Sequence, residues 1–160
     1  MIFAGSGHRS RSLGTDFPPR QLLLVEFAQI VIHKFEPTHI LSGMALGWDQ
    51  ALARAARREG VPYDAVIPFE GQERWWPSTD RAAYKDLLND AAGVQIVDAG
   101  GMPVRAALMA RNEAMVDQAD AVLGLWDGRD WGGTFQCLKY AHARGVRVHQ
   151  LYQDWQTFSA

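Results

Sequence analysis

The apolar residues of this chain fall into short continuous runs that alternate with longer segments of helical periodicity. The short runs predict buried strands, and they occupy residues 1–4, 39–42, 63–69, 94–97, 121–126 and 146–151. Helices are predicted between them, at residues 20–35, an alanine-rich stretch ending at 59, 79–89, 103–119 and 135–144. Strands that alternate with helices, and that are continuously apolar, are typical of a parallel sheet covered on both faces. We therefore expect an α/β fold: a Rossmann-like, doubly wound, mostly parallel sheet forming a single domain over residues 1–160.

Three segments outside these elements are expected to be irregular or weakly structured. Residues 11–17 are mostly polar, and residues 70–77 form a polar loop that contains the adjacent tryptophans Trp75 and Trp76. The tail after Tyr152 is amphipathic at best, and we expect it to pack loosely. Either loop tryptophan is suited to stack on a base or to wall a pocket, and packing in the core is the alternative.

Composition and charge narrow the classes of function. Of the 160 residues 48% are hydrophobic and 21% charged, which is ordinary for a globular protein. The formal charge of -2 provides no global basic field, which disfavours a bulk electrostatic grip on nucleic acid. The single cysteine, Cys137, excludes an internal disulfide, and the five histidines show no metal-ligand spacing. No apolar run is long enough for a membrane span and no signal segment opens the chain, so we expect a cytoplasmic protein without a metal.

Glycine-rich turns follow three of the predicted strands. They contain Gly5, Ser6 and Gly7, then Ser42, Gly43 and Gly47, and finally Gly132, Gly133 and Thr134. In a parallel sheet such turns share the edge formed by the carboxyl ends of the strands, where ligands bind near the topological switch point. The alternative is that each is an ordinary tight turn between a strand and a helix. Their shared position predicts a pocket for a nucleotide or another phosphate-bearing ligand.

Residues 132–134 stand where a strand is expected to turn into the N-terminus of a helix. The first backbone N–H groups of a helix lack intrahelical partners, and the helix dipole adds partial positive charge there. Glycines at that point let a phosphate approach the backbone closely. The structural alternative is a loop in which Thr134 serves as the helix N-cap.

Polar side chains near these turns suit the same kind of ligand. Arg9 and Arg111 are candidate charge partners for a phosphate, and Asp49 and Asp127 are candidate acceptors from ribose hydroxyls or a base edge. Their structural alternatives are a surface arginine, an acidic residue in a first helical turn, and an Asp-Gly turn. Asn112 falls on the apolar stripe of its helix, where an unpaired amide costs roughly a few kcal/mol. A ligand or a neighbouring loop backbone should satisfy it, and we favour a tie to the strand-end loops.

These residues form an ordered set of motifs. Residues 42–49 resemble the Ser-Gly-x-Ala-x-Gly-x-Asp motif of the DprA/LOG/YpsA superfamily, often called SLOG. Similar to its second half are Arg111, Asn112, Met115, Asp120 and residues 132–134. Residues 132–137, and residues 67–69 with Gln72, Glu73 and Trp76, look most like the YpsA-type branch. The resemblance covers most of the chain from residue 5 to about residue 145. It implies a Rossmann-like fold that binds nucleotides or nucleotide-derived ligands.

The resemblance also bears on catalysis. The LOG branch cleaves the N-glycosidic bond of nucleoside monophosphates, with a catalytic Glu in its Gly-Gly-x-Gly-Thr-x-x-Glu motif. Aligned on Gly133 and Thr134, this chain has Cys137 in place of that Glu, and a thiol does not stabilise an oxocarbenium-like transition state as a carboxylate does. We interpret Cys137 as a small buried helix residue. Hydrolysis is therefore disfavoured unless a displaced carboxylate such as Asp49, Glu73 or Asp127 takes the role.

We predict a nucleotide-binding protein that senses or sequesters a ligand resembling ADP-ribose, NAD or a nucleoside phosphate. No catalytic residue is assigned, no cofactor is required, and the resemblance implies a homo-oligomer. The alternatives are a LOG-like N-glycoside hydrolase and a DprA-like module that binds single-stranded nucleic acid. The residues predicted to bind the ligand are Gly5, Ser6, Gly7, His8, Arg9, Ser42, Gly43, Met44, Gly47, Asp49, Gln72, Trp76, Arg111, Asn112, Asp127, Gly132, Gly133 and Thr134.

Overall fold

A parallel β-sheet forms the centre of the protein. The computed structural model describes residues 1–98 and 100–160, and within these residues one six-stranded sheet has the order β4-β3-β2-β1-β5-β6. The strands are β1 Ile2–Gly7, β2 His39–Ser42, β3 Tyr63–Phe69, β4 Gly93–Asp98, β5 Ala121–Leu125 and β6 Arg147–Gln150. Every neighbouring pair is parallel. The strand order reverses between β1 and β5, so the predicted doubly wound α/β fold is confirmed, with its topological switch point at that pair.

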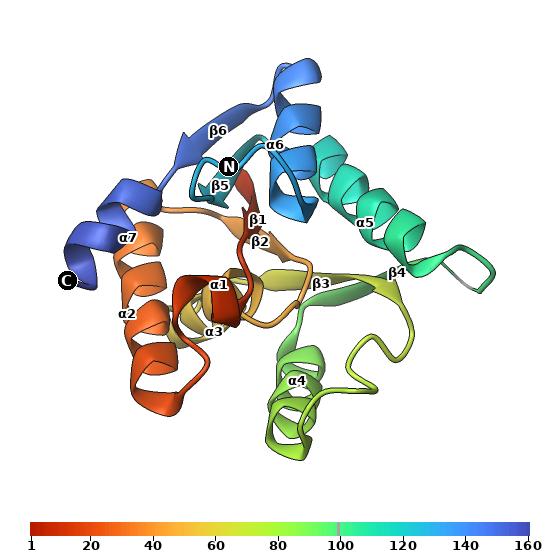
Figure 1. Cartoon of the computed structure of the whole chain (residues 1–160), viewed down its shortest axis with the longest axis horizontal. Helices are drawn as coiled ribbons and strands as arrows, with labels where there is room; N and C mark the ends of the chain where they lie inside the picture. The colour runs from red at the N-terminus through yellow and green to blue at the C-terminus, as the bar shows by residue number, and fades with distance from the viewer. Residues whose placement is uncertain (99) are drawn as a thin grey trace.

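Helices cover both faces of the sheet (Figure 1). The helices are α1 Ser10–Leu13, α2 Pro18–Phe35, α3 Trp48–Arg58, α4 Ser78–Asp90, α5 Val104–Gln118, α6 Gly133–Ala143 and α7 Tyr152–Phe158. The pair α5 and α6 packs on one face, whereas α2, α3 and α7 lie on the other and α4 packs beside α3. In the ranges that the structure describes, no helix combines the length and apolar character that crossing a membrane requires.

The central strands are buried on both faces, as their continuous apolar runs predict. All five residues of β5 are buried, and so are the four central residues of β1. Trp48, at the start of α3, is fully buried, and its indole Nε1 donates a hydrogen bond to the carbonyl oxygen of Leu123 in β5 at 3.0 Å. This side chain therefore joins α3 to the middle of the sheet, directly beneath the switch point.

The end of β1 differs from the prediction. The strand continues through Gly7, whereas the sequence pattern placed a loop from Gly5 onward. A Cβ at Gly5 would lie 2.7 Å from Leu52 Cδ2, and a Cβ at Gly7 would lie 2.5 Å from Trp48 Cδ1. The close packing of α3 on β1 therefore explains these two glycines. Residue type alone does not distinguish glycines that allow such packing from glycines in a loop.

Other local expectations are also corrected. The segment predicted to be irregular contains α1, whose Leu13 is buried, and the tail predicted to pack loosely forms α7. Trp155 of α7 is only 3% exposed, because its ring packs against Phe27 of α2 at a centroid distance of 5.5 Å. Helix α6 starts two residues earlier than predicted, with Gly132 rather than Thr134 at its N-cap position.

Candidate functional site

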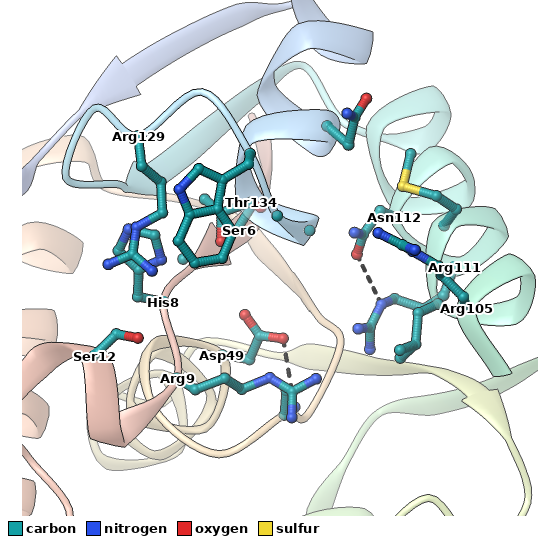
Figure 2. Close-up of a pocket in the computed structure, with 18 residues that line it drawn as sticks. Ser6, His8, Arg9, Ser12, Asp49, Arg105, Arg111, Asn112, Arg129 and Thr134 are labelled. Carbon is teal, nitrogen blue, oxygen red and sulfur yellow. Dashed lines mark hydrogen bonds between the residues drawn. The ribbon is translucent and has the colours of Figure 1, made fainter.

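A cleft of about 380 Å³ opens at the carboxyl ends of β1 and β5, at the switch point of the sheet (Figure 2). Its volume lies in the range of small-molecule sites, which is about 300–1,000 Å³. Five segments contribute: the end of β1 with the residues after it, α1, the loop into α3 with its first turn, one side of α5, and the loop from β5 into the start of α6. The lining residues are Ser6, Gly7, His8, Arg9, Ser12, Ala45, Asp49, Arg105, Leu108, Met109, Arg111, Asn112, Arg129, Trp131, Gly132, Gly133, Thr134 and Gln136.

The N-terminus of α6 forms one wall of the cleft. The first hydrogen bond of this helix runs from the Gln136 N–H to the Gly132 carbonyl oxygen at 3.1 Å, so the N–H groups of the three preceding residues have no partner within the helix. A Cβ built at Gly132 or Gly133 would have no heavy atom within 4 Å. The backbone is thus accessible there, and the helix dipole favours negative charge at this point.

Arg111 of α5 supplies a buried positive charge to the cleft. Its residue is 4% exposed, and its guanidinium donates from Nη1 to the Gly43 carbonyl oxygen and from Nε to Asn112 Oδ1 at 2.9 Å. Within residues 1–98 and 100–160 no carboxylate lies within 4.0 Å of this guanidinium. Burial lowers the pKa of Arg111, and the charge of Asp49 opposes that effect. The cleft therefore contains a guanidinium whose charge is not neutralised by a contacting acid.

Two sequence-based expectations are corrected by this geometry. Arg111 is buried, whereas the alternatives considered were a position on the pocket rim and a solvated surface. The amide oxygen of Asn112 is satisfied by Arg111, not directly by a strand-end loop. The expected hydrogen bond from this helix to the loop after β2 is present, but Arg111 rather than Asn112 makes it, to the Gly43 carbonyl oxygen.

Asp49, the second residue of α3, is the carboxylate among the residues that line the cleft. It is 7% exposed, and its Oδ2 accepts a weak hydrogen bond from the Ala45 N–H at 3.4 Å. Burial raises the pKa of Asp49 from its ordinary value, and the charges of Arg111 and Arg9 oppose that effect. A carboxylate whose pKa is raised in this way destabilises the fold when it is ionised.

Replacing Asp49 by asparagine is therefore expected to stabilise the protein at neutral pH. Because the folded pKa is raised, the stability contributed by protonated Asp49 is complete below the unfolded value of 3.8 and is lost as the pH rises through the folded pKa. Melting curves followed by circular dichroism from pH 4 to pH 8 would measure this. The Asp49→Asn variant should melt above the wild type at pH 7, with the gap narrowing towards pH 4. A lower melting temperature of the variant at pH 7 would refute the assignment.

The other arginines of the cleft differ in their pairing. Arg9 and Arg105 are exposed at its mouth, and the structure shows neither in an ion pair. Arg129 is neutralised by Asp127, which it contacts through Nε at 2.9 Å to both carboxylate oxygens and through Nη2. The cleft is thus locally basic although the whole chain carries a formal charge of -2.

His8 and Asp127 connect β1 to the loop after β5. The Asp127 N–H donates to His8 Nε2 at 3.0 Å, and Asp127 Oδ1 lies 3.0 Å from the same nitrogen. Burial lowers the pKa of His8, against the raising effect of Asp127. The hydrogen bonds from Arg129 hold the pKa of Asp127 far below its ordinary value. The carboxylate of Asp127 is therefore occupied by protein partners and does not line the cleft.

The structure brings many of the predicted site residues together in the cleft. Those that line it are Ser6, Gly7, His8, Arg9, Asp49, Arg111, Asn112, Gly132, Gly133 and Thr134. Those that lie outside its lining are Gly5, Ser42, Gly43, Met44, Gly47, Gln72, Trp76 and Asp127. The motif after β2 thus contributes mainly to the support of the cleft rather than to its surface.

The contacts of that motif explain its supporting role. Ser42 Oγ donates to the Asp49 carbonyl oxygen at 2.8 Å and accepts from the Met44 N–H at 3.1 Å, so this hydroxyl is used inside the loop. The Gly43 carbonyl oxygen accepts from Gln72 Nε2 at 3.2 Å as well as from Arg111. A Cβ at Gly43 would lie within 3 Å of the Arg111 guanidinium. These residues hold Arg111 in place.

Sequence reasoning missed part of the lining. The missed residues are Ser12, Ala45, Arg105, Leu108, Met109, Arg129, Trp131 and Gln136. Helical spacing offered a signal for those on α5, because Arg105, Leu108 and Met109 precede Asn112 by one and two turns on the same helix face. Ala45 is a fixed position of the motif at residues 42–49, whereas no comparable signal marked Ser12. Trp76, which was predicted to bind the ligand, packs edge-on against Tyr84 at a centroid distance of 5.3 Å and contacts the hydrophobic core.

Cys137 is a buried residue of α6, as expected. It is 1% exposed and does not line the cleft. Burial raises the pKa of its thiol to about 11, so the group is protonated at neutral pH. The position therefore offers neither a carboxylate nor a thiolate to the cleft.

Comparison with known sequences shows a moderate similarity to one curated protein. No family model matches the chain. The chain is similar to the uncharacterized SPbeta prophage-derived protein YoqJ of Bacillus subtilis (strain 168), with 28% identity over 145 residues. The similarity spans 81% of this chain and 84% of YoqJ.

Solved structures with the same fold are more numerous. DNA processing protein A (DprA) from Streptococcus pneumoniae has a TM-score of 0.66 and 20% identity over 93% of this chain. DprA from Helicobacter pylori, which binds single-stranded DNA, has a TM-score of 0.65 and 17% identity over 94% of this chain. The structural-genomics target TM1055 has a TM-score of 0.58 and 14% identity over 92%.

This chain spans only part of those structures. It covers 49% of the S. pneumoniae DprA chain, 64% of the H. pylori chain and 71% of TM1055. Identities at this level show a shared fold and no more. That fold agrees with the SLOG resemblance, and nothing in the similarity to YoqJ distinguishes the YpsA-type branch.

Proposed function

We propose that this protein binds a nucleotide or nucleotide-derived ligand in the cleft, with a phosphate group held between α6 and α5. The observation that carries the proposal is the buried Arg111 guanidinium, which faces the cleft without a contacting carboxylate. A buried charge with no opposite charge in contact is costly, and an anion that enters the cleft provides that opposite charge. Phosphate oxygens suit a guanidinium because the two form strong, charge-assisted hydrogen bonds.

The N-terminus of α6 supports the same position for the phosphate. The accessible N–H groups of Gly133 and Thr134 border the same cleft as Arg111, and both contributions favour negative charge. Arg9 and Arg105 at the mouth add long-range attraction that steers an anion inward. Asp49 is placed to accept hydrogen bonds from sugar hydroxyls, the role that its carboxylate oxygens suit.

Isothermal titration tests the proposal directly. AMP, ADP-ribose, NAD and cyclic nucleotides would each be titrated into the wild-type protein at low salt. Saturable binding of one or more of them at a single site is the expected result. Absence of binding by all of them, with no change of melting temperature in their presence, would count decisively against the proposal.

Replacing Gly133 by valine is expected to block the phosphate while leaving the fold intact. The new side chain would enter open space at the cleft, because a Cβ there has no heavy atom within 4 Å. Loss of the charge-assisted backbone contacts should weaken nucleotide binding about 10-fold to 100-fold. Lys139→Val, on an exposed position of the same helix outside the cleft, is the matched control. Equal nucleotide affinity of Gly133→Val and the control would show that the N-terminus of α6 does not bind the phosphate.

A second candidate is binding of single-stranded nucleic acid. It is favoured by the locally basic cleft with its exposed aromatic residue, and by the shared fold with DprA from H. pylori, which binds single-stranded DNA. Such binding would depend steeply on salt, because each neutralised phosphate releases a counterion. Gel retardation of a labelled single-stranded oligonucleotide at two salt concentrations tests this. A steep loss of retardation at the higher salt indicates contacts with several phosphates, whereas a mononucleotide needs only one phosphate site.

A third candidate, hydrolysis of an N-glycosidic bond, rests on Asp49. This buried carboxylate has a raised pKa and lies in the cleft, which is a common property of acid–base catalysts. Chromatography of nucleoside monophosphates incubated with the protein would show free base if Asp49 acts in this way. If the wild type releases base and Asp49→Asn does not, the function is hydrolysis of the ligand rather than binding alone.

A further inference from the structure

Trp131 is the exposed aromatic residue of the cleft. It is 64% exposed and lines the cleft immediately before the two glycines at the start of α6. It belongs to neither hydrophobic cluster of the core. Across the described residues no hydrogen bond involves its indole nitrogen. Core packing therefore does not explain the position of this large apolar side chain.

Arg129 supports one face of Trp131. The guanidinium carbon of Arg129 lies 4.9 Å from the centroid of the Trp131 ring, a cation–π contact. Asp127 holds that guanidinium by the paired contacts described above, and the Asp127 N–H in turn donates a hydrogen bond to His8 Nε2. The Trp126 indole Nε1 donates to the Arg129 carbonyl oxygen at 2.7 Å. Both the side chain and the backbone of Arg129 are thereby fixed.

The cleft is divided by this arrangement into two chemically different parts. Among the residues that the structure describes, no acid contacts Arg9, Arg105 or Arg111, whereas the charge of Arg129 is already neutralised by Asp127. Arg129 is for that reason better suited to support the indole than to bind a phosphate. Because Arg129 lies over one face of the indole, the opposite face is the one available to a stacked ligand.

We propose that Trp131, supported by Arg129, is the stacking platform for the base of the ligand, so that the cleft selects phosphates that carry an aromatic base over sugar phosphates. The proposal rests on the phosphate site described under the proposed function and adds the residue that holds the base. A flat aromatic surface accepts any base, because every base has a π face, and the larger face of a purine gains more from it than a pyrimidine. Trp131 directly precedes Gly132, so the platform and the phosphate site are adjacent in the chain.

Titration of AMP and of ribose 5-phosphate into the wild type and into Trp131→Ala tests this inference. The two probes share the sugar and the phosphate and differ in the base. The wild type should bind AMP about 10-fold to 100-fold more tightly than ribose 5-phosphate, the range that one base stacked on an aromatic residue provides. Trp131→Ala should lose that preference while its affinity for ribose 5-phosphate stays unchanged. Trp131→Phe should retain most of it.

Trp75→Ala is the matched control, because Trp75 is 88% exposed and does not line the cleft. It should behave as the wild type with both probes. Equal affinity of the wild type for AMP and ribose 5-phosphate would overturn the stacking platform and leave the phosphate site standing. A similar loss of affinity for both probes in Trp131→Ala would also overturn it, since the residue would then act on the phosphate site. Binding of neither probe by the wild type would overturn the platform for nucleoside monophosphates, and the titrations of ADP-ribose, NAD and cyclic nucleotides would then decide the proposed function separately.

Discussion

Replacing Arg111 by methionine is expected to reduce affinity for AMP about 100-fold, the effect of removing a charged hydrogen-bond partner from a buried site. The guanidinium is 4% exposed and has no contacting carboxylate in the part of the chain that the structure describes. Methionine retains much of the volume of the side chain but has no charge. The fold should persist, because removal of an unneutralised buried charge relieves its desolvation and Gln72 still donates to the Gly43 carbonyl oxygen.

Two other arginines serve as controls for this variant. Arg105→Met at the exposed mouth of the cleft should weaken binding only a few-fold, because exposed charges are screened by solvent. Arg81→Met, on an exposed position of α4 outside the cleft, should change nothing. Calorimetry and thermal melts on all three variants separate affinity from stability. An Arg111→Met protein that melts normally and binds AMP as the wild type does would show that Arg111 only supports the loop.

Replacing Gly47 by alanine is expected to destabilise the protein by about 3 kcal/mol, the sum of backbone strain and overpacking. Gly47 precedes α3 with a φ of 108° and a ψ of -131°, a backbone conformation that residues other than glycine rarely adopt. A Cβ there would also lie 2.5 Å from the carbonyl oxygen of His8, which is backbone and unable to rotate away. The loop that carries His8 and Arg9 must therefore move, and nucleotide affinity should fall along with stability.

Gly60→Ala isolates the strain from the collision. Gly60 has a φ of 69°, and a Cβ there would meet no heavy atom within 4 Å, so only the left-handed conformation is penalised, at about 1 kcal/mol. Urea unfolding of the two variants compares the two effects. A loss of stability in Gly47→Ala no greater than that in Gly60→Ala would show that the loop after β1 adapts without cost.

Much of the fold followed from the pattern of apolar residues. The bounds of β2 and β3 match the prediction, and the other strands differ from it by a few residues. Parallel strands buried on both faces need continuous apolar runs, so their sequence signal is strong. The signal was weak for α7, because the burial of Trp155 against Phe27 depends on two residues far apart in the chain. It was misleading at Gly5 and Gly7, where small size serves helix packing rather than a turn.

The candidate site was anticipated in its position and less well in its composition. The glycines before α6 were recognisable because a strand, two glycines and a helix in succession place free N–H groups at a sheet edge. The polar residues of the loop after β2 were predicted to bind the ligand, and the structure shows Ser42 and Gly43 hydrogen-bonded within the protein. The same donor and acceptor groups can bind a ligand or hold a loop together, so residue type did not distinguish these two roles.

The sequence by itself determined the class of fold, the edge of the sheet where the cleft lies, and the absence of a carboxylate at position 137, because each depends on local pattern or on residue identity. Only the tertiary structure decided that Arg111 is buried without a contacting acid while Arg129 is neutralised by Asp127. The state of a charge depends on its solvent exposure and on its partners, and the contacts of Arg111 with Gly43 join positions 68 residues apart. That difference between the two arginines is not visible in the sequence, and on it we base the proposal of separate places for a phosphate and for a base.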